Sequence, residues 1–409
     1  MNSFRSSWIA AALLGLALSS AGIVQAQLPE RALAPSFAPE RIAAIQGRLQ
    51  ARFDSIYAAG DFPGASAGFR LPDGTAFTLT VGVSDREAGT PMEPNDRMLT
   101  GSVGKTFVAA VALQLVSEGL LDLDRLVSEY LGNESWYPSL PNGQKITVRM
   151  LMTHTSGIVR YEFNEQFTRD LTADPEKVWR PEELVAYILD TEPPFPAGQG
   201  WTYSDTNFIL LGMIIERITG STLYEEIRTR LLQSLNLTGT VPSDSRRIPG
   251  LVQGYAGPGN PFGGTDAMLH GGIFAINPQF EWAGGGFATT AGDLARWAAD
   301  IYEGRAYDPT LLEQALNGVP ARQLGRGARY GLGVIIWDTP VGPAWGHSGF
   351  FPGYLTEMRY YPEHRFAVAF QANTSVGRAL GRSTGAIVDE FARIVIEEIG
   401  RPPYGNGGW

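Results

Sequence analysis

The sequence predicts an α+β fold in which both ends of the chain contribute strands to one antiparallel sheet and a large helical region separates them. Three observations support this prediction. Strand-like segments bounded by turn residues lie before residue 90 and again after residue 330, and most of the chain between them, from about 103 to 300, has helical periodicity. Helical segments also flank both strand regions. We therefore expect one large domain whose functional site lies at the junction of the sheet and the helical region.

The first 26 residues are typical of a secretory signal peptide. Arg5 supplies positive charge, Trp8 to Leu18 form a short apolar core, and Ala26 ends a small-residue cleavage site. We expect cleavage after Ala26, a periplasmic or secreted mature protein, and no stable membrane insertion after cleavage. The remaining chain divides into a linker over 27–38, the domain over 39–400 and a tail over 401–409.

Composition argues against several classes of partner and cofactor. The 409-residue chain has 32 basic and 42 acidic side chains, a net charge of −10 and no basic clusters, so a nucleic-acid partner is not expected. It has no cysteine, so the fold must depend on its core, and 44% hydrophobic residues are enough for a large one. The four histidines are far apart and lack the H-E-x-x-H spacing, so neither a metal nor another cofactor is expected.

The N-terminal part of the predicted sheet follows a helix. Residues Pro39 to Ala59 repeat apolar side chains at helical spacing. Two strand-like segments follow, Ala65 to Arg70 and Thr75 to Val83, and the turn Pro72-Asp73-Gly74 joins them. This order predicts an N-terminal helix followed by an antiparallel hairpin.

The central helix of the prediction begins at Ser102 and continues to about Glu118. Between Phe107 and Val116 only one residue is polar, so this helix is expected to be buried on nearly all sides. Residues 250–288 are rich in glycine and aromatic residues without periodicity, which predicts a long loop near the site rather than core. The other helical segments of this region are 148–152, 181–189, 207–218, 223–235 and 289–302.

The C-terminal part of the sheet is predicted to be a meander that ends in a helix. The turn Pro362-Glu363-His364 separates the last two strands, and the helix carries a regular apolar face. The predicted strands are 333–337, 343–347, 354–361 and 365–373, and the predicted helix is 386–399.

The start of the central helix carries a possible catalytic pair. Ser102 and Lys105 are three residues apart, so on a helix they lie on one face, and a serine nucleophile needs a basic partner within hydrogen-bond reach. Gly104-Lys105-Thr106 also match the end of the phosphate-binding loop pattern G-x-x-x-x-G-K-[ST], but that pattern requires its first glycine at the position of Leu99. From these residues alone, an ordinary capped helix start stays open as the alternative.

A different serine arrangement, the nucleophile elbow G-x-S-x-G, occurs twice but in the wrong context. The elbow needs a strand before its serine, a helix after it, and a later acid and histidine. Ser66 is followed by a predicted hairpin, and no histidine follows Ser383. His154, in a turn rich in Thr and Ser, is interpreted as a hydrogen-bonded structural residue.

Two further segments combine with Ser102 and Lys105. Tyr203-Ser204-Asp205 precedes an apolar helix, and His347-Ser348-Gly349 ends a predicted strand. With these motifs in this order, the sequence resembles the serine hydrolases related to class C β-lactamases, a family that also includes DD-carboxypeptidases, D-aminopeptidases and esterases. Shorter motifs such as Tyr330-Gly331-Leu332-Gly333 also resemble those of this family, and the resemblance covers about residues 40–399. It implies a β-lactamase-like fold.

The resemblance implies acyl transfer to Ser102. Ser102 would attack a carbonyl, and Tyr203, with its pKa lowered by Lys105, would accept the serine proton and return it to the leaving group. The backbone N–H groups of Ser102 and Phe350 would form the oxyanion hole, and water would hydrolyse the acyl-enzyme. His347 would border the site and orient Tyr203 or the substrate. The residues implied in substrate binding are Asp205, Ser348 and Gly349.

The sequence departs from the family pattern at two places. Asp205 stands where the family usually has asparagine; an ionised carboxylate cannot donate a hydrogen bond, but beside Lys105 it would keep the ammonium charged. Val334 or Ile335 lies near the place where some carboxypeptidases have an arginine for the substrate carboxylate. We therefore predict an exported hydrolase of a small-molecule or peptide amide or ester. A DD-carboxypeptidase, a class C-like β-lactamase and a non-catalytic penicillin-binding scaffold are the alternatives.

Overall fold

The structure is a computed structural model that describes residues 34–258, 260–262 and 266–400. The predicted signal peptide over 1–26, most of the linker and the tail over 401–409 lie outside the described residues. Of the described helices, none is both long and apolar enough to cross a membrane.

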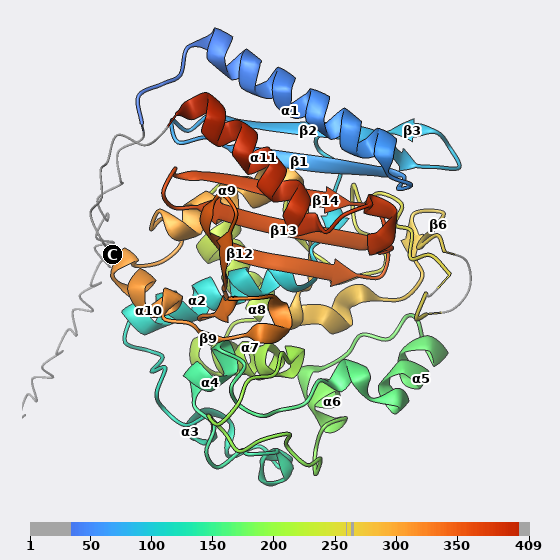
Figure 1. Cartoon of the computed structure of the whole chain (residues 1–409). Helices are drawn as coiled ribbons and strands as arrows, with labels where there is room; N and C mark the ends of the chain where they lie inside the picture. Colours follow the sequence, from blue (N-terminus) through green and yellow to red (C-terminus); the bar gives the residue numbers. More distant parts are fainter. Residues whose placement is uncertain (1–33, 259, 263–265, 401–409) are drawn as a thin grey trace, which may run out of the picture.

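A nine-stranded antiparallel sheet joins the two ends of the described chain, as the sequence predicts (Figure 1). The join is the pairing of β1 with β14, in register from Ala65 opposite Ala372 to Arg70 opposite Ala367. In spatial order the strands are β3 (Thr90–Pro91), β2 (Ala76–Asp85), β1 (Gly64–Arg70), β14 (Phe366–Ala372), β13 (Tyr354–Tyr361), β12 (Gly342–Phe351), β11 (Ile335–Thr339), β10 (Arg329–Tyr330) and β9 (Val319–Pro320).

Helices cover both faces of this sheet. The terminal helices α1 (Pro39–Ala59) and α11 (Thr384–Ile399) lie across one face, where Phe53 packs edge-on against Phe370 and Phe391. Helix α9 (Ala291–Tyr302) packs against β1, β13 and β14 on the opposite face. Because successive residues of a strand point to opposite faces, β14, which is buried along its whole length, contributes to both cores.

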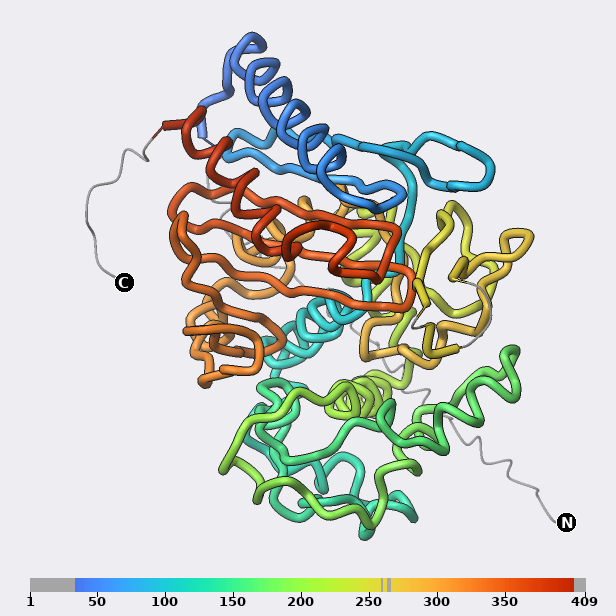
Figure 2. Tube along the Cα trace, turned by 45° about the vertical axis from the view of Figure 1, so that its right-hand side comes forward, coloured from blue at the N-terminus to red at the C-terminus, as the bar shows by residue number. Residues whose placement is uncertain are grey.

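The helical region lies beside the sheet, and α2 (Lys105–Ser117) runs between the two (Figure 2). Helices α2 and α7 (Asp205–Thr219) pack against each other and are buried along most of their length, as their nearly continuous apolar sequence predicts. The remaining α-helices of the described residues are α3 (Ser128–Leu131), α4 (Val148–Met152), α5 (Glu165–Ala173), α6 (Pro181–Ala186), α8 (Leu223–Ile227) and α10 (Leu312–Leu316).

Two local predictions need correction. The central helix does not begin as an α-helix at Ser102, because Gly101–Gly104 form a 3-10 turn and α2 starts at Lys105. Residues 250–288 are a loop near the site only in part. Residues Pro278–Gly284 form a buried helical segment, and β8 (Phe287–Thr289) is a buried strand between β4 (Met98–Leu99) and β5 (Val241–Pro242). A small hairpin completes the loop, from β6 (Leu269–His270) and β7 (Ile273–Phe274).

The turn that carries Ser102 is held by close backbone packing against β12. A Cβ atom on Gly349 would overlap the carbonyl oxygen of Thr100, and a Cβ on Gly101, whose φ is +50°, would overlap the backbone of Phe350. Glycine is therefore required at both positions, because a side chain would separate the strand from the turn.

We predict that Gly349→Ala destabilises the protein by about 1–3 kcal/mol, because the new methyl group overlaps the Thr100 carbonyl and forces the backbone apart. The matched control is Gly377→Ala, where no atom lies within 4 Å of the added Cβ and the free energy of unfolding should change by less than about 0.5 kcal/mol. Denaturant unfolding of both variants measures the difference. Equal stability of the two variants would contradict this packing argument.

Candidate active site

The predicted site residues, apart from the buried Lys105, line one cavity of about 750 Å³ between the sheet and the helical region. Ser102 lines this cavity from the turn that precedes α2. Apolar side chains from α5, the loop 261–262 and β12 form much of its wall. The lining includes Ser102, Arg160, Glu162, Phe163, Tyr203, Asp205, Phe262, Phe280, Glu281, Leu324, Ile335, His347, Ser348, Gly349 and Phe350.

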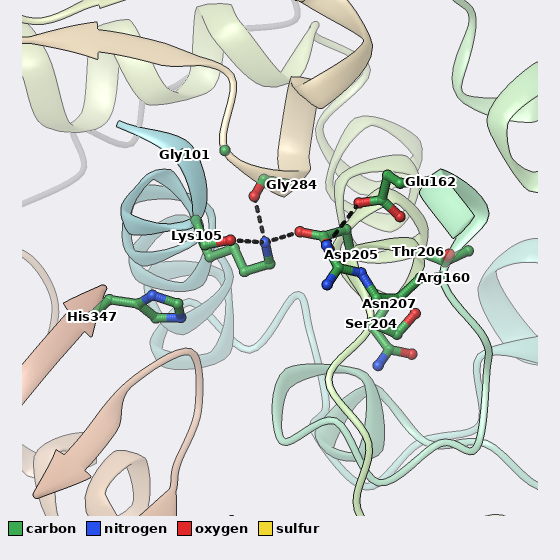
Figure 3. Close-up of polar contacts among 12 residues, drawn as sticks. Gly101, Lys105, Arg160, Glu162, Ser204, Asp205, Thr206, Asn207, Gly284 and His347 are labelled. Carbon is green, nitrogen blue, oxygen red and sulfur yellow. Dashed lines mark hydrogen bonds and ion pairs between the residues drawn. The ribbon is translucent and has the colours of Figure 1, made fainter. Parts of the chain in front are cut away.

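Lys105 is completely buried beside Ser102 and contacts three oxygen atoms (Figure 3). Its Nζ lies 3.1 Å from Ser102 Oγ and also donates to a carboxylate oxygen of Asp205 and to the carbonyl of Gly284. A lysine ammonium has three N–H donors and no acceptor, so this set of three acceptors matches the charged form. The arrangement places a fixed positive charge next to the serine oxygen.

Asp205 holds this ammonium from the first residue of α7, directly after the N-cap Ser204. Its second carboxylate oxygen forms an ion pair of 2.6 Å with Arg160. Burial by itself would raise the pKa of Asp205, but Lys105 and Arg160 outweigh burial and lower the pKa below its usual range. Asp205 is therefore ionised between two cations at neutral pH.

Two further carboxyl groups, Glu162 and Glu281, face the cavity and were not predicted. Burial, followed by the charge of Asp205, raises the pKa of Glu162 well above its usual range. The same two causes raise the pKa of Glu281 to about 7. Glu162 lies in the short 3-10 helix Tyr161–Phe163, two residues after Arg160, and Glu281 lies in the segment that was predicted to be a loop. Neither belongs to a motif, so no pattern in the sequence indicated them.

Tyr203 lies against Lys105, but its hydroxyl is not paired with the ammonium. Lys105 Nζ lies 5.0 Å from the centre of the Tyr203 ring, and within the described residues the hydroxyl has no hydrogen bond of normal geometry. Burial and then the Asp205 charge raise the pKa of Tyr203 well above 10, although the Ser102 hydroxyl and Arg160 oppose this rise. The structure therefore does not show the expected lowering of this pKa by Lys105.

His347 is held in one tautomer at the end of the cavity. Its Nδ1 lies 2.6 Å from the Ser348 carbonyl, which can only accept, so Nδ1 carries the proton and Nε2 accepts from the Tyr330 hydroxyl at 2.9 Å. Burial, with a contribution from Lys105, lowers the pKa of His347 to about 3. The imidazole is therefore neutral, and Tyr330 is a supporting residue whose role the sequence did not reveal.

The structure also brings together the other predicted residues of the site. Ser348 and Gly349 line the cavity from β12, and the backbone of Phe350 packs against Gly101, directly before Ser102. Ile335 lines the cavity near the place where some carboxypeptidases have arginine. Arg326 and Arg329, which lie near Ile335 in the sequence, are exposed and do not line the cavity, so neither takes the place of that arginine.

The residues that the sequence assigned to structure lie outside the reacting centre. Ser66 is buried within β1, and Ser383 caps α11 by accepting from the Ala386 N–H. His154 Nδ1 accepts from the Ser204 N–H, and its ring packs 4.3 Å from the Tyr203 ring. Over the described ranges, no group of three His, Asp or Glu side chains is placed to hold a metal ion.

Comparison with known proteins agrees with this geometry. Residues 49–391 match the sequence profile of the family described as Beta-lactamase. The chain is 26% identical to penicillin-binding protein 4 of Amycolatopsis lactamdurans, over 87% of this chain and 92% of that one. It is 27% identical to esterase EstB of Burkholderia gladioli, over 75% and 87%. A D-stereospecific amidohydrolase from Streptomyces sp. superposes with a TM-score of 0.70 at 29% identity, over 83% of this chain and 96% of that one.

We predict that His347 does not titrate between pH 8 and pH 5, because burial keeps its imidazole neutral and the Ser348 carbonyl holds the proton on Nδ1. Side-chain NMR of protein labelled with ¹⁵N-histidine measures this, and His347→Gln assigns the signal. The signal should show the Nδ1–H tautomer throughout. A midpoint near the ordinary histidine value of about 6.5 would contradict the prediction.

Proposed function

The chain belongs to the beta-lactamase family and is a serine hydrolase, and we propose that it cleaves an amide or ester bond through an acyl intermediate on Ser102. The observation that carries this proposal is the placement of Ser102 Oγ, 3.1 Å from the buried Lys105 ammonium and open to the cavity. A serine oxygen becomes an effective nucleophile when its developing negative charge meets a preorganised positive charge.

In the proposed first step, Ser102 Oγ bonds to the substrate carbonyl carbon and the bond to the leaving group breaks. Lys105 stabilises the charge on Oγ and keeps its own proton, because Asp205 pairs with it. Tyr203 takes the serine proton while its own phenolic proton passes to the leaving atom. This exchange needs no phenolate, which fits the raised pKa of Tyr203.

In the proposed second step, water bonds to the acyl carbon and Ser102 Oγ leaves with a proton, again through Tyr203. The backbone N–H groups of Ser102 and Phe350 would bind the carbonyl oxygen in both steps, where negative charge develops. The close packing of Gly101 against the Phe350 backbone supports this pairing of donors. His347 would support the strand end from which Phe350 comes.

The walls of the cavity favour a substrate with an apolar or aromatic group and no free carboxylate near the scissile bond. Phe163 and Phe350 are 74% and 57% exposed and line the cavity, where they can contact such a group. Arg160, the cation among the described lining residues, is paired with Asp205 and is therefore not free to bind a substrate carboxylate. These features favour an amidase or esterase over a carboxypeptidase or a β-lactamase, whose substrates carry a carboxylate.

We further propose that the chain is exported and that its signal peptide is cleaved after Ala26. The support is the sequence of the first 26 residues, with Arg5 before a short apolar segment. N-terminal sequencing of the protein recovered from a periplasmic fraction or the medium should begin at Gln27. A mature protein that retains the first residues would contradict this proposal.

We predict that a fluorophosphonate adds one covalent group to the native protein and none to Ser102→Ala, because Oγ is the atom that bonds to phosphorus as fluoride leaves. Intact-mass measurement detects the adduct. Lys105→Met should slow labelling by at least about 100-fold, since the charge beside Oγ is lost. An unlabelled native protein would contradict the proposal. Failure to turn over any ester or amide would favour the non-catalytic scaffold.

We predict that the amide of an aromatic amino acid is hydrolysed with a kcat/KM at least about tenfold above that of a matched dipeptide with a free C-terminal carboxylate. The reason is that Arg160, the cation among the described lining residues, is already paired with Asp205, so no free cation is left there to hold an added carboxylate. Both enantiomers of each substrate should be assayed. A preference for the carboxylated dipeptide, or rapid hydrolysis of penicillin, would instead favour the carboxypeptidase or the β-lactamase.

A further inference from the structure

Arg160 occupies an unusual position at the edge of the active site. It lies in the loop directly before the short helix Tyr161–Phe163, and its side chain is 29% exposed. Its guanidinium forms the 2.6 Å ion pair with the outer carboxylate oxygen of Asp205 and lies 3.5 Å from Glu162 (Figure 3). The same group lies 5.5 Å from the centre of the Tyr203 ring.

Four side chains, those of Ser102, Lys105, Asp205 and Arg160, form a row of contacts that starts at the proposed nucleophile. Lys105 contacts Ser102 and one oxygen of Asp205, and Arg160 contacts the other oxygen. A carboxylate placed between two cations is held at both oxygens and divides its attraction between them. Without Arg160, the outer oxygen of Asp205 would lose the cation that pairs with it, and the neighbouring carboxyl group of Glu162 cannot replace that positive charge.

Two changes would follow from the loss of Arg160. The pKa of Asp205 would rise, because one of the two cations that lower it is removed. The carboxylate would also be free to rotate toward Lys105 and draw Nζ away from Ser102 Oγ. The 3.1 Å contact between Nζ and Oγ is thus linked, through Asp205, to a residue that does not touch the serine.

We propose that Arg160 is a positioning residue that acts through Asp205: it holds the carboxylate in the orientation that keeps the Lys105 ammonium against Ser102. This inference rests on the proposed role of Ser102 as nucleophile. It assigns to Arg160 a function in the rate of serine acylation that is separate from any contact with the substrate.

The experiment measures the second-order rate of fluorophosphonate labelling from pH 4 to pH 9 for the native enzyme, Arg160→Met, Asp205→Asn and the double variant. Arg160→Met should label about tenfold more slowly at pH 7. The acid limb of its profile should move to higher pH, because Arg160 lowers the pKa of Asp205 and of the neighbouring Glu162 and Glu281, and its loss lets this group of carboxyls take up protons more easily. Arg160→Lys keeps a cation and should stay within about threefold of the native rate.

The double variant separates action through Asp205 from direct contact. In the Asp205→Asn background, Arg160→Met should slow labelling by less than about twofold, because the group through which Arg160 acts is gone. An equal loss in both backgrounds, or an unmoved acid limb in Arg160→Met, would overturn the proposal while leaving Ser102 labelling intact. An unlabelled native enzyme would overturn the proposed function and this inference together.

Arg305→Met is the matched control for the loss of a partly buried arginine. Arg305 is 21% exposed and bridges Asp300 and Glu303, as Arg160 bridges Asp205 and Glu162, but it does not line the cavity. Thermal unfolding of both variants reports the structural cost. Arg305→Met should keep the native labelling rate and pH profile; a shift of the acid limb equal to that of Arg160→Met would overturn the proposal.

Discussion

The buried ion pair between Lys105 and Asp205 is the interaction on which the rest of the site depends. Both side chains are removed from water, and a buried charge is tolerated only when it is paired and its remaining donors and acceptors are satisfied. Gly284 and Ser102 complete the contacts of the lysine, and Arg160 forms an ion pair with the second oxygen of the aspartate. The pair thus ties the start of α2, the start of α7 and the segment before β8 to one point.

Close backbone packing also fixes the position of the turn that carries Ser102. The Ser102 turn lies between β12 and the segment that contains Gly284, and glycines at Gly101 and Gly349 allow the backbones to approach. A rigid turn between a strand and a buried helix fixes the serine oxygen relative to the ammonium. Catalysis by preorganised charge requires this kind of rigidity, because dipoles that must first reorient contribute less to stabilising the transition state.

Periodicity predicted the regular elements well where burial is strongly patterned. The helix Pro39–Ala59 and the strand Tyr354–Tyr361 have the predicted bounds. In the helix, apolar residues recur on one face with a period of 3.6 residues, and the strand lies in a sheet that is covered on both sides. Residues 250–288 were predicted less well. Trp282 has φ +35° inside its short helix, and the buried strand Phe287–Thr289 has too few residues for a period to be visible.

The sequence by itself determined the fold class and the membership in a serine hydrolase family, because Ser102, Lys105, Tyr203 and His347 belong to short motifs with a fixed order along the chain. Only the tertiary structure decided the charge environment of these residues. Arg160, Glu162 and Glu281 carry no motif, and electrostatic effects depend on distance and burial, which are properties of the folded chain. The raised pKa of Tyr203 follows from the same cause: burial and a neighbouring carboxylate that spacing along the sequence does not reveal.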